Sequence, residues 1–235
     1  MNSKPIHPNA VDLHDAMAKE WEQKYTHPRF QRRAAQFFRL VSGVSVAGQL
    51  WLDAGCGTGH LLRQLLERDC KVIGVDASKE MLHAAQRLTG DGKAAPHGYC
   101  RIRTIGCLPF SDTTFDGVVC SSVIEYLDDP NAALAELSRV LKPGGILLIS
   151  APNRQSPLRL CLKLAYAISA IFSANPWPKY LSYSINEYSR DGLAQHLELY
   201  GFKVRQMDYY SPVGSRFIPS WTGSLLIGMA VKSFA

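Results

Sequence analysis

Hydrophobic positions along this chain follow two spacings, one typical of buried strands and one typical of amphipathic helices. Short apolar runs predict strands at 50–52, 70–75, 99–105, 115–120 and 146–151. Between these runs, apolar side chains recur every three or four residues, which predicts helices packed against a sheet. Repeated alternation of the two patterns predicts an α/β domain whose sheet is mostly parallel, with helices on both faces.

The same spacing extends the pattern to both ends of the chain. Before residue 46 it predicts two helices, at 12–25 and 28–41, which are separated at Pro28. After Ser189 it predicts one more helix, ended at Gly201, and then two strands at 202–210 and 224–234.

Three glycines join the first predicted strand to its helix in the stretch 50–62, LWLDAGCGTGHLL. Without a β-carbon, Gly55, Gly57 and Gly59 can adopt positive φ and let backbone N–H groups approach a ligand at the positive end of the helix. Asp76 ends the next strand, 21 positions beyond Gly55, where an acid can accept hydrogen bonds from ribose hydroxyls. A plain strand-to-helix turn is the alternative, but loop and acid together indicate a nucleoside-containing cofactor.

The glycine spacing distinguishes between nucleoside cofactors. A dinucleotide fingerprint needs G-x-G-x-x-G, and counted from Gly55 its last place is His60, so NAD is disfavoured. D-x-G-x-G-x-G with a following acid instead resembles motif I of class I S-adenosylmethionine (SAM)-dependent methyltransferases. LPFSDTTFDGVV (108–119) and ELSRVLKPGGILLIS (136–150) resemble the ubiquinone and menaquinone biosynthesis subgroup. The resemblance covers residues 12–153.

This resemblance implies a Rossmann-like, seven-stranded, mostly parallel sheet with a final antiparallel strand, and SAM as the cofactor. The cofactor contacts that it implies are Asp53, Gly55, Cys56, Gly57, Gly59, Asp76, Ala77, Met81, Thr104, Ile105, Cys120 and Ser121. It also suggests that Arg32 or Arg33 pairs with the cofactor carboxylate. Thr104 departs from the family, which has an aspartate there for the adenine amine, and a neutral acceptor weakens affinity by up to about tenfold.

Methyl transfer is an in-line displacement at a sulfonium, so the protein aligns the reactants and, for some acceptors, removes a proton. It requires no metal. We expect Glu125 to be the base and Tyr25 to position the acceptor; the full set of candidates is His14, Tyr25, His27, Glu125 and Tyr126. In the resembling family the N-terminal helices cover the cofactor, so Trp21 and Tyr25 are candidate contacts, with simple packing as the alternative.

The segment after residue 153 departs from the family pattern. Between residues 154 and 180 it has four basic side chains and no acidic one, on an apolar, aromatic-edged helix. We expect a cap helix over the active site, and the alternative is a segment that lies on a membrane surface. Both interpretations indicate an apolar substrate. The predicted parts are an N-terminal helical cap (1–45), the SAM-binding core (46–153), this insert (154–188) and the closing helix and strands (189–235).

Composition narrows the function classes. The net charge is +6, but basic residues are dispersed, and no Asn/Asp-Pro-Pro-aromatic loop follows the fourth strand, so nucleic acid is disfavoured as a partner. Six scattered cysteines predict reduced thiols and no zinc site. Without a signal peptide or a long apolar run, we expect a cytoplasmic protein, with peripheral membrane contact as an option.

These observations predict SAM-dependent methylation, on oxygen, nitrogen or carbon, of a small lipophilic metabolite. An RNA or protein methyltransferase and a non-catalytic SAM-binding protein are the alternatives.

Overall fold

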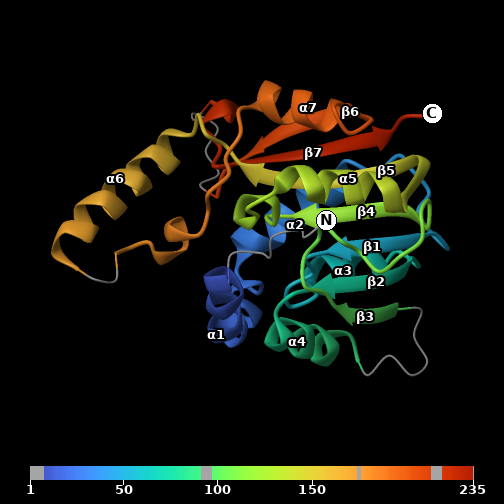
Figure 1. Ribbon diagram of the computed structural model, residues 1–235, viewed down its shortest axis with the longest axis horizontal. Helices are drawn as coiled ribbons and strands as arrows, with labels where there is room; N and C mark the ends of the chain where they lie inside the picture. The colour runs from blue at the N-terminus through green and yellow to red at the C-terminus, as the bar shows by residue number, and fades with distance from the viewer. Residues whose placement is uncertain (1–7, 91–96, 174–175, 213–218, 235) are drawn as a thin grey trace.

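A seven-stranded sheet organises the chain, in the strand order β3-β2-β1-β4-β5-β7-β6 (Figure 1). The computed structural model describes residues 8–90, 97–173, 176–212 and 219–234, so positions 1–7 of the predicted N-terminal cap lie outside the described residues. The strands are β1 (Leu50–Ala54), β2 (Lys71–Asp76), β3 (His97–Arg101), β4 (Phe115–Ser121), β5 (Leu141–Pro152), β6 (Phe202–Tyr210) and β7 (Leu225–Lys232). The first five are parallel, and β7 is antiparallel to both neighbours, which confirms the predicted fold class.

Helices cover both faces of the sheet and create two cores. Trp51 and Leu52 are consecutive on β1, so their side chains point to opposite faces, and both are fully buried. Trp51 packs in a core with residues of α2 (Pro28–Arg39) and α3 (His60–Leu66). Leu52 packs in the other core, with residues of α5 (Pro130–Val140) and α7 (Arg190–Glu198). Strand β1 therefore belongs to both cores.

Local sequence sets where the helices begin. The Ser78 hydroxyl accepts a hydrogen bond from the Met81 N–H (3.1 Å) and starts α4 (Lys79–Thr89). The Asp129 carboxylate does the same at α5, and the Ser189 hydroxyl at α7. The start of α7 agrees with the helix predicted after Ser189.

Two strands differ from their predicted bounds. Strand β3 ends at Arg101 rather than residue 105, because the chain turns away once the Ile102 N–H has bonded to the Asp76 carbonyl (3.0 Å). Strand β5 begins at Leu141 rather than at residue 146. Its pairing with β4 jumps from Phe115↔Leu141 to Gly117↔Ile146, so 143–145 form a bulge within the strand.

The first and sixth helices complete the structure. Helix α1 (Pro8–Lys24) packs on α4 beside the parallel part of the sheet. Helix α6 (Pro157–Phe172) projects away from the body and returns through the 3-10 turn η2 (Lys179–Ser182) (Figure 1). We call residues 157–173 and 176–185 the arm. In the part of the chain that the structure describes, no helix is long and apolar enough to cross a bilayer.

Candidate functional site

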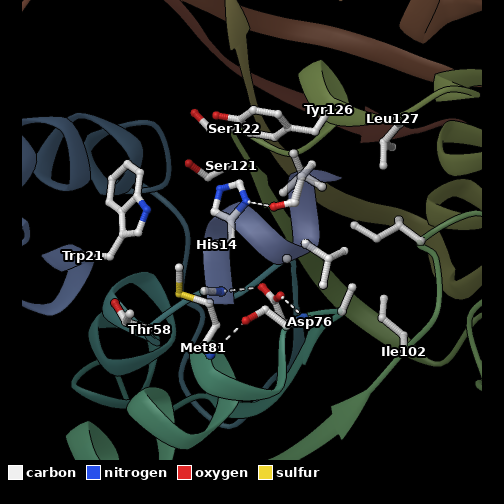
Figure 2. Close-up of a pocket in the computed structure, with 18 of the residues that line it drawn as sticks. His14, Trp21, Thr58, Asp76, Met81, Ile102, Ser121, Ser122, Tyr126 and Leu127 are labelled. Carbon is white, nitrogen blue, oxygen red and sulfur yellow. Dashed lines mark hydrogen bonds between the residues drawn. The ribbon is translucent and has the colours of Figure 1, made fainter. Parts of the chain in front are cut away.

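A cavity opens at the carboxyl ends of β1, β2 and β4, where α1 covers it. It encloses about 850 Å³, including the solvent at its mouth. The chain leaves β1 toward β2 on one side, and β4 lies on the other, so the cavity occupies the switch point where open α/β sheets bind ligands. Figure 2 shows Asp76 and Met81 at one side of the cavity and Ser122 and Tyr126 at the other.

The three loop glycines have positive φ, as predicted, but for different reasons. A β-carbon at Gly55 (φ +79°) would come within 2.3 Å of the Val123 side chain, and one at Gly59 (φ +80°) within 2.9 Å of Ala85. These two glycines are needed for packing. A β-carbon at Gly57 (φ +53°) would meet nothing within 4 Å. Gly57 therefore borders open space, where the backbone can approach a ligand.

Asp76 holds the glycine loop and faces the cavity. Its Oδ2 accepts a hydrogen bond from the Gly57 N–H (2.8 Å), and its Oδ1 accepts one from the Ser78 N–H (2.9 Å). A carboxylate has about four acceptor sites, so capacity remains for two ribose hydroxyls. Burial raises the pKa of Asp76 despite these two bonds.

A second buried carboxyl lies beneath the loop. Asp53 is 2% exposed, and its Oδ2 has no hydrogen-bond partner among the described residues. Burial, followed by the negative charge of Asp76, raises the pKa of Asp53 to about 7. The carboxyl groups of Asp53 and Asp76 are close enough to interact, and both lie at the same cavity. Their negative charge favours a cationic ligand in the cavity.

Arg33 supplies the opposite charge from α2. It lines the cavity, and its Nη2 donates to the Ser121 Oγ (2.8 Å). Within the described residues Arg33 has no carboxylate partner, whereas Arg32 is exposed and donates to the Pro212 carbonyl. Of the two arginines considered from the sequence, Arg33 is the one at the cavity.

These groups fit SAM. Its carboxylate matches Arg33, its ribose matches Asp76, and its positive sulfonium and ammonium match the field of the Asp53 and Asp76 carboxyl groups. The apolar side chains of Met81 and Ile105 line the part of the cavity beyond Asp76, as an adenine ring requires. The charge pattern of the cavity is therefore complementary to a zwitterion that carries an additional positive charge.

The structure separates the predicted cofactor residues into two groups. Seven line the cavity: Gly55, Gly57, Asp76, Ala77, Met81, Ile105 and Ser121. The other five are not among the lining residues: Asp53, Cys56, Gly59, Thr104 and Cys120. Thr104 is 8% exposed, and its Oγ1 accepts from the Gly106 N–H (3.1 Å), so its hydroxyl serves a turn. Cys120 is fully buried behind Ser121, and burial raises the pKa of its thiol to about 12.

Helix α1 brings His14 and Trp21 to the cavity, and Tyr25, directly after the end of this helix, adds a third aromatic side chain. The Nδ1 of His14 lies 2.7 Å from the Ala10 carbonyl oxygen (Figure 2). A carbonyl can only accept, so Nδ1 carries the proton, and Nε2 of the neutral ring keeps its lone pair. The Trp21 Nε1 is buried without a partner among the described residues. Tyr25 stacks on His60, and burial raises its pKa, which keeps the phenol protonated.

Glu125, expected from the sequence as the base, is not among the residues that line the cavity. It is 5% exposed, and its Oε2 accepts from the Ser184 Oγ (3.1 Å). Ser184 in turn accepts from Arg159 Nη2 (2.7 Å), and Arg159 pairs with Glu187 (Nε–Oε2 3.2 Å). His27 caps α2 at an exposed position away from the cavity. The buried network had no local signal in the sequence, because residues that bond directly to each other in it are up to 59 positions apart.

Comparison with known proteins gives a consistent result. Residues 52–149 match the family model described as a methyltransferase domain. The chain is 39% identical over 111 residues to the malonyl-[acyl-carrier protein] O-methyltransferase of Serratia marcescens, which covers 47% of this chain and 41% of that protein. It is 25% identical over 222 residues to the ubiquinone biosynthesis O-methyltransferase of Marinobacter nauticus, which covers 91% of this chain and 90% of that one.

A solved structure shares the whole fold. The magnesium protoporphyrin IX methyltransferase of Synechocystis PCC 6803, with bound SAH, superposes with a TM-score of 0.69 at 19% identity, covering 95% of this chain and 98% of that chain. At that identity the likeness concerns the fold. The match to the Serratia protein spans less than two thirds of that protein's length.

Proposed function

We propose that this chain is a class I SAM-dependent methyltransferase that transfers the methyl group of SAM to a small, apolar acceptor; the methyltransferase-domain match over residues 52–149 and the two O-methyltransferase relatives support this. The observation that carries the proposal is the charge pattern of the cavity. Arg33, which has no carboxylate partner among the described residues, lies at one end, and the carboxyl groups of Asp53, which is buried, and Asp76, which is partly buried, lie at the loop. When bound, SAM supplies an electrophilic methyl group on its sulfonium.

The residues of the chain then bind and align the reactants. Asp76 holds the ribose, Arg33 holds the carboxylate, and Gly57 leaves room for both. The field of Asp53 and Asp76 stabilises the positive charge before the reaction. Helix α1 shields the cavity from water, since its residues Ala10 and Val11 line the cavity.

The acceptor side of the cavity combines apolar walls with a few polar groups. Val11, Val123 and Leu127 are apolar, and Ser122 and Tyr126 lie between them. This lining favours an apolar acceptor with one reacting polar group. Both curated relatives are named O-methyltransferases, which favours an oxygen acceptor. Such a molecule dissolves in lipid, so the proposal includes peripheral contact between residues 154–183 and a membrane.

We assign proton removal to His14 rather than to Glu125. The Ala10 carbonyl holds the His14 Nδ1–H, so the basic Nε2 is available in a cavity that Glu125 does not line. Tyr25 retains its proposed role in positioning, as a protonated phenol on the same wall. Glu125 supports the adjoining wall through Ser184 and Arg159.

Calorimetry with SAM and SAH tests the cofactor assignment. We expect micromolar binding that falls at least about tenfold in Asp76→Ala, which loses the ribose acceptor. Asp128→Ala, which removes an exposed carboxylate that does not line the cavity, is the matched control and should bind normally. Absence of binding to the unmodified chain would overturn the proposal.

Labelled SAM incubated with the protein and a cell metabolite extract identifies the acceptor by mass analysis. The methylated product should be small and extractable into organic solvent. With that acceptor, His14→Asn should lower kcat and shift the pH profile, while SAM affinity stays unchanged. The control is His83→Asn, an exposed histidine on α4. A protein or RNA product would contradict the acceptor class.

A further inference from the structure

The arm carries an apolar surface that the body of the protein does not cover (Figure 1). Leu160, Leu164, Ile168, Ile171 and Phe172 are spaced by three or four residues or are adjacent, so they form one stripe along α6. Exposure increases toward the tip, to 75% at Ile171 and 83% at Phe172, and Trp177 beyond the turn is 66% exposed. We call these six residues the apolar stripe.

The arm does not serve as a lid over the cavity in this structure. Among the described residues that line the cavity, none comes from 154–183. The arm projects from the body and contributes no residue to the cavity lining, so apolar contact with a bound acceptor does not explain the stripe. A water-exposed stripe of this size indicates a docking surface.

The charge of the arm favours an anionic occupant. Residues 154–186 contain four basic side chains and no acidic one. Arg159 and Lys163 turn toward Glu187 at the base of the arm. Arg154 and Lys179 are exposed and form no ion pair within the described residues, so the base of the arm and its returning turn keep free positive charge.

The base of the arm is fixed to the wall of the cavity. The Ser156 Oγ donates to the Thr222 carbonyl (2.8 Å), and the Ile185 N–H donates to the Glu125 carbonyl (2.9 Å). Glu125 belongs to the short turn η1 (Ile124–Tyr126), whose last residue lines the cavity. A partner that binds the arm therefore lies close to the acceptor side of the cavity.

We propose that the arm docks on an anionic lipid bilayer, with the apolar stripe at the level of the headgroups. A projecting helix with leucine, isoleucine and phenylalanine on one side, a tryptophan beyond its tip, and free cations at its base and in the returning turn is suited to a fluid interface, which needs no complementary shape. The inference deepens the proposed function, because a lipid-dissolved acceptor then enters the cavity from the membrane on which the enzyme sits.

Flotation of the full chain with lipid vesicles tests the proposal without turnover. We expect binding to phosphatidylcholine vesicles with about a third phosphatidylglycerol, weaker binding to phosphatidylcholine alone, and weakening by salt. Ile171→Asp combined with Phe172→Asp should reduce binding at least about tenfold. The matched control is Leu199→Asp, at an 80% exposed leucine beyond α7, which should float normally.

The outcomes separate the alternatives. Failure of the unmodified chain to float on either vesicle would overturn the proposal, and so would equal losses in the tip variant and the Leu199 control. A dimer in solution that disappears in the tip variant, without flotation, would assign the stripe to a second copy instead. SAM calorimetry on the same tip variant should match the unmodified chain, so failure of docking and failure of the proposed function are distinguishable.

Discussion

Asp53 offers a quantitative test of the electrostatics beneath the glycine loop. Its carboxyl is almost fully buried, and burial followed by the charge of Asp76 raises its pKa from 3.8 to about 7. The folded chain therefore holds this proton more tightly than the unfolded chain does. The neutral carboxyl contributes stability that is fully present below the unfolded pKa and is lost as the pH rises toward 7.

The magnitude follows from the shift. About three pKa units correspond to about 4 kcal/mol, of which more than half is lost between pH 5 and pH 8. Asp53→Asn cannot ionise. Its free energy of unfolding relative to the unmodified chain should therefore increase by about 3 kcal/mol over this range.

Urea unfolding of both proteins without SAM, at pH 5 and pH 8, measures the difference. Asp128→Asn, which changes an exposed carboxylate, should show no such pH-dependent difference from the unmodified chain. If the difference between Asp53→Asn and the unmodified chain were the same at both pH values, the reasoning that Asp53 is a buried carboxyl with a raised pKa would be refuted.

Three further outcomes follow from the site. SAM should bind more tightly at pH 8 than at pH 6, because its positive charge favours ionised Asp53, and calorimetry of Asp53→Asn should show a weaker dependence. Gly59→Ala should lower the free energy of unfolding by about 2 kcal/mol, since its β-carbon meets Ala85 at positive φ, whereas Gly43→Ala, with open space around it, should not. Arg33→Met should weaken SAM binding about tenfold but leave 5′-methylthioadenosine, which has no carboxylate, unaffected; equal losses for both ligands would contradict the assigned contact.

The elements that local sequence controls were predictable. Strand and helix positions follow from apolar spacing, and Ser78, Asp129 and Ser189 each begin a helix because their side chains cap it. Positive φ at the loop glycines was predictable for the same reason, since it depends on the stereochemistry of a single residue.

Side-chain roles that depend on distant partners were not predictable. Arg159 and Lys163 are four residues apart and so share a helix face, but the partners of Arg159, Ser184 and Glu187, lie 25 and 28 positions further along the chain. Glu125 turns toward Ser184 for the same reason. The choice between Arg32 and Arg33 needed the rotation of α2 relative to the sheet, which apolar spacing gives only approximately.

Strand β1 links the cofactor to the whole molecule. Its side chains belong to both cores, and a β-carbon at Gly117 on β4 would come within 2.3 Å of the Trp51 ring, so the centre of the sheet tolerates little local rearrangement. Because the ligand loop continues directly from this strand, the loop and both cores should unfold in one cooperative transition. A ligand held only by the loop then protects every element: at a hundred times its dissociation constant it adds about 2.7 kcal/mol to global stability. Hydrogen exchange should slow on both faces of the sheet, not only around the cavity.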